Sequence, residues 1–297
     1  MTHQEIAELF GVSRVKVTRR LAEARRRGVV KITIDGDEHP FVDLETRLAR
    51  RFSLGQAWVA PRLGDNRRSL ESLGLTGAQC LYALVPGRRT LAVGTSSSVA
   101  AAVDALRPTA VGELDVVPIA GSWSGRANAT NPHELALRLA TAFGGRAYHL
   151  PVPFLASTAE VAATLLADEA VRETLAVAAA ADVLLVGIGG TDDSSGLLVG
   201  SVSREQLGEV VSAGAVGDVS GRFFDAQGAP VRSALDDRVV GLDLERLRHI
   251  PTRVAIAAGP SKLPAITTAL THGLLTVLVT DAATATALLE TPVAATG

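Results

Sequence analysis

Cysteine and aromatic residues are scarce in this sequence. Its 297 residues include one cysteine, two tryptophans and two tyrosines. A single cysteine, Cys80, excludes an intramolecular disulfide framework and is typical of proteins in a reducing compartment. Glu5, Glu8 and Arg14 occupy positions where a secretory signal needs an apolar segment. We therefore expect a cytoplasmic protein without a secretory signal.

Long apolar runs are also missing. The most apolar stretch, residues 175–188, carries Asp182 at its centre. It therefore predicts a buried helix end followed by a strand, not a membrane span. The chain length and the 47% hydrophobic content suit one large core with a short appendage. We expect no membrane partner.

Charge is distributed unevenly along the chain. The formal net charge is −2, yet residues 1–34 contain eight Lys or Arg against three Glu, which gives +5 there and −7 for the rest. A basic end on an acidic body indicates that this end meets a polyanion. The alternative is a solvated basic face, because a run such as residues 25–27 is often only exposed surface.

The amino-terminal residues predict two helices joined by a tight turn. Thr2 and Glu5 form a capping-box pattern at the start of the first helix, and Gly11 interrupts it. Ser13 is placed to cap a second helix over residues 14–27. This arrangement predicts a helix-turn-helix.

A strand over residues 29–34 and a return near Gly36 would complete a winged module. The start of the second helix would then enter the major groove of DNA and contact phosphates and base edges. The expected DNA-binding residues are Ser13, Arg14, Lys16, Thr18 and Arg19. An amphipathic hairpin with a basic face is the alternative. A complete winged module begins with one more helix, so residues 1–38 are expected to form a truncated one.

Residues 39–54 are expected to be a linker with a helix over residues 39–52, and residues 55–297 an effector-binding domain. Strands are predicted over residues 57–60, 91–94, 115–120, 147–150, 183–187, 238–241, 254–258 and 276–280. Helices are predicted over residues 70–84, 97–106, 132–143, 168–179, 203–212, 262–272 and 281–289. This alternation is typical of an α/β fold with a mostly parallel, Rossmann-like sheet covered on both faces.

Three loops that follow predicted strands carry glycine and polar residues, at 94–98, 187–191 and 259–262. In such a sheet these loops leave the same edge and form the ligand site. Two of them open a helix, whose free N–H groups attract anions. Lys262 is the single lysine after Lys31, and a compact ammonium beside a helix end favours a phosphate-like anion. Taken alone, each loop is also explained by a tight turn or a helix cap.

Short motifs spread over nearly the whole chain, from residues 4–7 to 279–281, carry a family resemblance. They include G-V-S-R-V-K-V at 11–17, residues 48–54, G-A-V-G-D at 214–218 with Phe224 and Asp225, and G-P-S-K at 259–262. In order and spacing they resemble the SorC family of bacterial sugar-responsive transcription regulators. The resemblance implies a domain like the sugar-phosphate isomerase and deaminase fold used as a sensor, a phosphorylated sugar or polyol as effector, and a homo-oligomer such as a dimer or tetramer.

The expected effector-binding residues are Gly94, Thr95, Ser96, Ser97, Ser98, Gly121, Ser122, Asn131, Gly189, Asp225 and Lys262. The resemblance assigns the 94–98 loop and Lys262 to the phosphate. It assigns Gly121, Ser122, Asn131 and Asp225 to the sugar. Residues 217–225 are expected to form a polar loop that completes the pocket, although turn formation explains them equally well. The family usually has an aromatic residue and a glycine near Thr95, so the serine-rich segment here implies a ligand of different size or phosphorylation.

Two functions are open on the sequence alone. In the first, a regulator without catalytic residues, cofactor or metal changes its DNA affinity when a sugar binds. In the second, the chain is a sugar-phosphate isomerase or deaminase with a general base among Asp192, Asp193, Asp218 and Asp225. The histidines at 133, 149, 249 and 272 are scattered and show no relay or metal spacing, which favours the regulator. At least a dimer is expected, because paired DNA half-sites require two modules.

Overall fold

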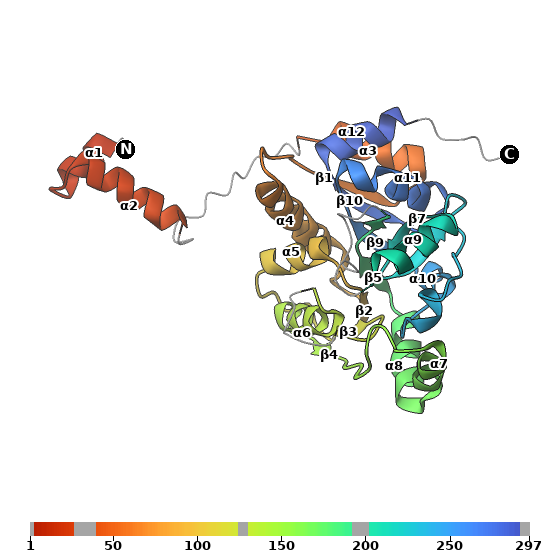
Figure 1. Ribbon diagram of the computed structural model, residues 1–297. Helices are drawn as coiled ribbons and strands as arrows, with labels where there is room; N and C mark the ends of the chain where they lie inside the picture. The colour runs from red at the N-terminus through yellow and green to blue at the C-terminus, as the bar shows by residue number, and fades with distance from the viewer. Residues whose placement is uncertain (1–2, 27–39, 124–129, 192–201, 292–297) are drawn as a thin grey trace. The chain divides into compact units, whose positions relative to one another are not determined.

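The computed structural model describes residues 3–26, 40–123, 130–191 and 202–291. The chain divides into two compact units, Met1–Pro40 and Phe41–Gly297 (Figure 1). The first is built from helices alone within its described residues, and the second is an α/β unit.

Two helices joined by a tight turn form the described part of the first unit, as predicted. α1 (His3–Leu9) and α2 (Arg14–Arg26) flank Gly11, whose φ of +61° suits glycine because it has no Cβ. The N–H of Val12 donates to the carbonyl oxygen of Ala7 at 2.9 Å and closes the turn. The predicted Thr2–Glu5 capping contacts, the strand over residues 29–34 and the wing near Gly36 lie outside the described residues.

A seven-stranded parallel sheet is the centre of the second unit, with strand order β1-β10-β9-β5-β2-β3-β4. Its strands are β1 (Gln56–Ala60), β2 (Thr90–Val93), β3 (Asp115–Pro118), β4 (Arg146–Ala147), β5 (Val183–Val186), β9 (Thr252–Ile256) and β10 (Val277–Asp281). The central strands are almost continuously apolar, which is expected when both faces of a sheet are covered. The prediction of a mostly parallel α/β sheet is confirmed.

Two hydrophobic cores lie on the opposite faces of this sheet. Leu91 and Val93 of β2 contribute to one core, whereas Ala92 between them contributes to the other, because successive strand residues point to opposite faces. The first core is covered by α4 (Asn66–Leu84), α5 (Ser97–Ala105) and α6 (Pro132–Phe143). The second is covered by α3 (Val42–Phe52), α8 (Glu169–Ala179), α11 (Leu263–Thr271) and α12 (Ala282–Glu290).

The expected linker helix packs as part of the second unit. α3 lies against β1 and α12. Leu48, near its middle, is fully buried, and Phe52 at its end is also buried. Ser53 follows with a left-handed φ of 53° and donates its N–H to the carbonyl oxygen of Ala49, which ends the helix.

Residues 215–225 form a β-hairpin where a polar loop was expected. β7 (Ala215–Val219) pairs antiparallel with β8 (Arg222–Asp225), and the two-residue β6 (Gly189–Gly190) pairs with β7 on its other side. The turn consists of Ser220 and Gly221, and both have positive φ angles, 50° and 78°, as a type I′ hairpin turn requires. The prediction missed this sheet because its strands are short and two of them, β6 and β7, contain glycine, which weakens the alternating pattern.

The strand predicted over residues 238–241 is wrong. A short 3-10 helix, η1 (Asp236–Arg238), occupies its start, and Val239 and Gly241 make only isolated bridges to Leu155 and Ala120. The helices α7 (Ala159–Ala167) and α10 (Leu244–Arg248) are absent from the prediction, and α9 (Arg204–Ser212) is present as expected.

No helix within the described residues combines the length and apolar character needed to cross a membrane.

Candidate functional site

The three loops singled out from the sequence leave neighbouring strands. β9, β5 and β2 are adjacent in the sheet and parallel. The loops after them, residues 259–262, 187–191 and 94–98, therefore begin at the same edge of the sheet. In open parallel sheets this edge is where ligands bind.

The 94–98 loop leads into α5, and Ser96 is the N-cap residue of that helix. The Ser96 hydroxyl accepts from the N–H groups of Ser98 at 3.2 Å and Val99 at 3.4 Å. Thr95 donates its hydroxyl to the carbonyl oxygen of Thr130 at 2.7 Å. A Cβ on Gly187 would lie 2.2 Å from the Ser96 hydroxyl oxygen, so only glycine fits beside this cap. Thr95 and Ser96 thus shape the loop, and Ser97 is the exposed serine at the helix start.

A groove of about 420 Å³ opens between this loop, the start of α4 and the short helix η2 (Pro260–Lys262). Its volume falls within the range of small-ligand sites. Its polar lining residues are Arg62, Asn66, Ser69, Ser97, Ser98, Ser261, Lys262 and Asp281. The groove is therefore lined by two cations, Arg62 and Lys262, by the N-terminus of α5, and by one carboxylate, that of Asp281. This excess of positive charge favours an anionic ligand.

Asp281 and Arg62 form an ion pair in this groove. A guanidinium nitrogen of Arg62 lies 3.6 Å from an Asp281 carboxylate oxygen; the Arg62 side chain is 44% exposed and that of Asp281 is 7% exposed. The other Asp281 oxygen accepts the Thr284 N–H at 2.7 Å and caps α12. Asp281 is thus held by the fold, whereas the half-exposed Arg62 can turn toward a ligand.

The positive charge of Lys262 also influences Asp218 in the β6–β7–β8 sheet. Burial raises the pKa of the Asp218 carboxyl, and the Gly221 N–H together with the positive charge of Lys262 partly offset that shift. The Asp218 carboxylate accepts the Gly221 N–H at 2.8 Å. A Cβ on Gly189 would lie 1.8 Å from an Asp218 oxygen, so Gly189 lets the carboxylate approach the backbone. Gly189, Asp218 and Lys262 therefore share one region of the site.

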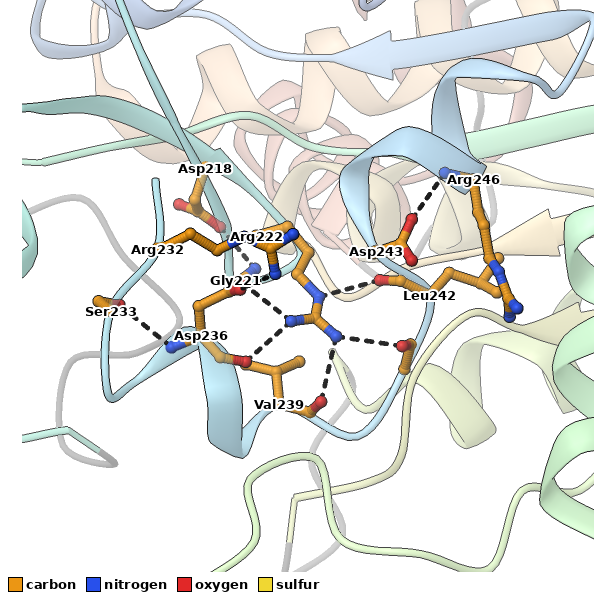
Figure 2. A network of polar contacts seen from close by, with 11 residues as sticks. Asp218, Gly221, Arg222, Arg232, Ser233, Asp236, Val239, Leu242, Asp243 and Arg246 are labelled. Atoms are coloured by element: carbon orange, nitrogen blue, oxygen red, sulfur yellow. Dashed lines mark hydrogen bonds and ion pairs between the residues drawn. The ribbon is translucent and has the colours of Figure 1, made fainter. Parts of the chain in front are cut away.

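The hairpin turn is anchored by a buried arginine. Figure 2 shows the Arg222 guanidinium beside Asp236, Val239 and Leu242. It donates to the carbonyl oxygens of Asp236, Val239, Gly241 and Leu242, at 2.9 to 3.1 Å, and to an Asp236 carboxylate oxygen at 2.9 Å. Arg222 is only 7% exposed. These carbonyls are turned toward Arg222, which explains why residues 238–241 do not join the sheet.

Gly121 and Ser122, two of the residues expected to contact the sugar, make backbone hydrogen bonds to other chain segments. Gly121 donates its N–H to the Val240 carbonyl at 2.9 Å, and a Cβ there would lie 2.3 Å from the Pro153 oxygen. Ser122 exchanges backbone hydrogen bonds with Val152 and Phe154. Both are thus explained by close packing of two chain segments at the end of β3.

Asn131 and Asp225 each make hydrogen bonds to nearby backbone groups. Asn131 caps α6 by accepting the His133 N–H at 3.3 Å, and donates to the Trp123 carbonyl at 3.3 Å. Asp225 accepts the N–H groups of Gln227 and Ala229, both at 2.9 Å. It lies at the end of β8, at the end of the hairpin opposite to its turn.

The expectation that the histidines are scattered is wrong for one pair. His133 at the start of α6 and His149 after β4 approach to 2.9 Å between their Nδ1 atoms, with their rings nearly perpendicular. Burial and the neighbouring His149 lower the pKa of His133, and Glu134 partly offsets this. The two histidines are 16 residues apart in the chain, so no local pattern indicated this contact. Within the described ranges no three His, Cys, Asp or Glu side chains gather as a metal site would require.

All five residues expected to contact DNA lie exposed at the start of α2. Ser13 accepts the Lys16 N–H at 3.2 Å, so its hydroxyl also caps the helix. Thr18 donates to the Arg14 carbonyl at 3.0 Å. Val17, between them in sequence, is 5% exposed. The start of α2 thus presents the side chains of Arg14, Lys16 and Arg19 to solvent on one helix.

Comparison with known proteins covers both units. Residues 39–290 match the family model described as "Putative sugar-binding domain", and residues 1–44 match the Crp-like helix-turn-helix domain. The chain is 35% identical to the erythritol catabolism regulatory protein EryD of Brucella abortus (strain 2308), over 98% of this chain and 93% of that protein. It is 31% identical to the transcriptional regulator LsrR of Escherichia coli (strain K12), over 98% of this chain and 90% of LsrR. The crystal structure of the full-length sorbitol operon regulator SorC from Klebsiella pneumoniae superposes with a TM-score of 0.80 at 25% identity, covering 98% of this chain and 94% of that one.

These matches define the class of protein: a helix-turn-helix joined to a sugar-binding domain makes a DNA-binding transcription regulator. The α/β fold agrees with this class. The chain belongs to the SorC family of sugar-binding transcription regulators. The predicted family, fold and regulatory function are confirmed, and the relatives give no support to the isomerase or deaminase alternative.

Proposed function

We propose that the effector is a small phosphorylated sugar or polyol whose phosphate binds in the groove lined by Ser97, Ser98, Arg62 and Lys262. The observation that carries this proposal is the convergence of two cations and the N-terminus of α5 on a groove of about 420 Å³. Anions are stabilised at helix N-termini and by charge-assisted hydrogen bonds. Two of the relatives are named for polyols, erythritol and sorbitol.

The carbon chain of the effector would extend from the phosphate toward Gly189 and Asp218. Lys262 influences Asp218 electrostatically and also lines the groove, so it stands between the two parts of the site. A carboxylate is a good acceptor for the hydroxyl groups of a sugar. Asp218 therefore takes the sugar-contacting role for which the sequence pointed to Asp225.

Effector binding would change operator affinity through the helix-turn-helix in residues 1–38. Arg14, Lys16 and Arg19 would contact DNA phosphates or base edges, and Ser13 and Thr18 would add hydroxyl contacts. Two paired half-sites require at least two copies of this module, so we propose a homo-oligomer that acts on DNA in the cytoplasm. In this role the protein binds the sugar phosphate and releases it unchanged. Incubation with a sugar phosphate followed by ³¹P NMR tests that, because isomerisation or deamination would shift the signal.

The effector proposal is tested by thermal unfolding with erythritol phosphate, sorbitol phosphate, the free polyols and inorganic phosphate. A ligand present at a hundred times its Kd stabilises the folded state by about 2.7 kcal/mol. Lys262→Met should abolish the stabilisation by the phosphates. Arg88→Met is the matched control, because Arg88 is exposed in the turn before β2, at the other edge of the sheet. Stabilisation by free polyols that Lys262→Met leaves unchanged would contradict a phosphate site.

DNA binding is tested by the salt dependence of affinity for a random duplex. Removing the side chain that binds one phosphate should lower the slope of log K against log salt by about 0.9. Arg14→Ala and Arg19→Ala should each reduce the slope, whereas Arg88→Ala should leave it unchanged. Equal slopes for the wild type and all three variants would contradict a DNA-contacting role for α2.

A further inference from the structure

Ser220 combines two unfavourable features at one residue. Its φ of 50° lies in the left-handed region, which residues with a Cβ rarely adopt. The residue is 6% exposed, and its hydroxyl has no hydrogen-bond partner among the residues that the structure describes. A buried hydroxyl without a partner and a strained backbone both destabilise a fold. Glycine would avoid both, so the serine hydroxyl needs another explanation.

The surrounding contacts hold Ser220 in this conformation. Arg222, two residues on, is fixed by five hydrogen bonds to residues 236–242 (Figure 2). Asp218, two residues before, accepts the Gly221 N–H across the turn. A Cβ on Gly221 would lie 2.8 Å from the Phe154 ring, so this ring packs closely under the turn. The position of the Ser220 hydroxyl is therefore set by the fold.

That position is at the effector edge of the sheet. A Cβ on Gly94, the residue that follows β2 and opens the 94–98 loop, would lie 2.1 Å from the Ser220 hydroxyl oxygen. The same Cβ would approach Ile119 at 2.9 Å and Val186 at 3.1 Å. Gly94 thus leaves room for the hydroxyl, and the other side chains near Gly94 are apolar. The neighbouring Trp123, stacked on Phe154, has a buried ring N–H that likewise has no partner in the described part of the chain.

We propose that Ser220 recognises a hydroxyl group on the carbon chain of the effector. The serine hydroxyl can donate one hydrogen bond and accept another, which matches a polyol better than a deoxygenated or purely anionic ligand. The inference rests on the proposed function, because it assumes that the phosphate of the same molecule lies beside Lys262. Ser220 would then determine specificity, whereas Lys262 supplies affinity for the phosphate.

Two substitutions separate the hydroxyl from the backbone strain. Ser220→Gly removes both, and Ser220→Ala removes only the hydroxyl. Ser53→Gly is the matched control, because Ser53 also has a left-handed φ, 53°, but is exposed at the end of α3. Ser53→Gly and Ser220→Gly should both raise the melting temperature of the free protein.

Titration calorimetry with erythritol phosphate, sorbitol phosphate and inorganic phosphate gives the decisive readout. Both Ser220 variants should bind the better polyol phosphate roughly tenfold more weakly than the wild type, as expected when one hydrogen bond is removed. Their affinity for inorganic phosphate should not change, and Ser53→Gly should match the wild type for every ligand. Unchanged polyol phosphate affinity in Ser220→Gly and Ser220→Ala would overturn the inference while leaving the phosphate site intact. A wild type that binds none of the phosphates would instead refute the proposed function, and the inference with it.

Discussion

Replacement of Arg222 by methionine tests how the hairpin turn is held. Arg222 and Asp236 are 7% and 8% exposed and form an ion pair at 2.9 Å. Arg222→Met leaves the Asp236 carboxylate buried, with only Arg232 nearby at 3.9 Å among the described residues, and removes the donor from four backbone carbonyls. Breaking one side of a buried ion pair typically costs about 3–5 kcal/mol. Because a domain of this size loses roughly 2–4 °C for each kcal/mol, the melting temperature should fall by about 6–20 °C.

Differential scanning calorimetry and urea unfolding measure this change. Arg232→Met is the matched control, because the Arg232 side chain is 81% exposed and exposed ion pairs contribute only about 0–1 kcal/mol. A double variant, Arg222→Met with Asp236→Leu, should be less destabilised than expected from the two single variants, since no charge then remains buried alone. The reasoning would be refuted if Arg222→Met lowered the melting temperature no more than Arg232→Met.

Three further predictions concern the cores and the site. Burial raises the pKa of Cys80 to about 12, so a thiol reagent at neutral pH should label it only after unfolding, and rapid labelling of the native protein would be inconsistent with this burial. The pKa of Asp218 is raised in the folded state, so its contribution to stability is complete below the unfolded-state pKa and is lost as pH rises through the folded-state pKa. Asp218→Asn should therefore raise the melting temperature more at about pH 8 than at about pH 4, and a pH-independent difference would contradict the assignment. A Cβ on Gly74 would lie 2.5 Å from the Ala101 carbonyl oxygen, whereas one on Gly208 meets nothing within 4 Å. By urea unfolding Gly74→Ala should destabilise by about 1–3 kcal/mol, and Gly208→Ala in helix α9 should stabilise by about 0.5–1 kcal/mol; equal effects would show that α4 and α5 are less closely packed.

The sequence was sufficient where a pattern is local. Short apolar strands and the alternation of strands with helices are encoded within a few residues, and they predicted most strands and helices of the parallel sheet. Gly11 and Ser13 did the same for the helix-turn-helix. Because parallel strands end at one edge, the common position of the three polar loops at that edge also followed from the sequence.

Several side-chain contacts could not be found in this way, because they join residues far apart in the chain. Arg62 meets Asp281 across 219 positions, and neither carries a local signal of ligand binding. His133 and His149 come together only because α6 begins beside the end of β4. Asp225 was predicted as a sugar contact, and the structure adds that its carboxylate accepts two N–H groups of the turn that follows it.

The sequence by itself determined the fold class, the family and the basic helix, because hydrophobic periodicity, capping and charge are properties of short segments. Tertiary structure decided which polar groups come together at one edge of the sheet. Lys262 stands out in composition, but its neighbours Arg62 and Asp218 come from distant parts of the chain. Ser220 places its hydroxyl beside Gly94 because Arg222 fixes the hairpin to a distant segment of the chain. Such long-range hydrogen bonds form between chain segments that have no local relation, so they are readable only once the fold is known.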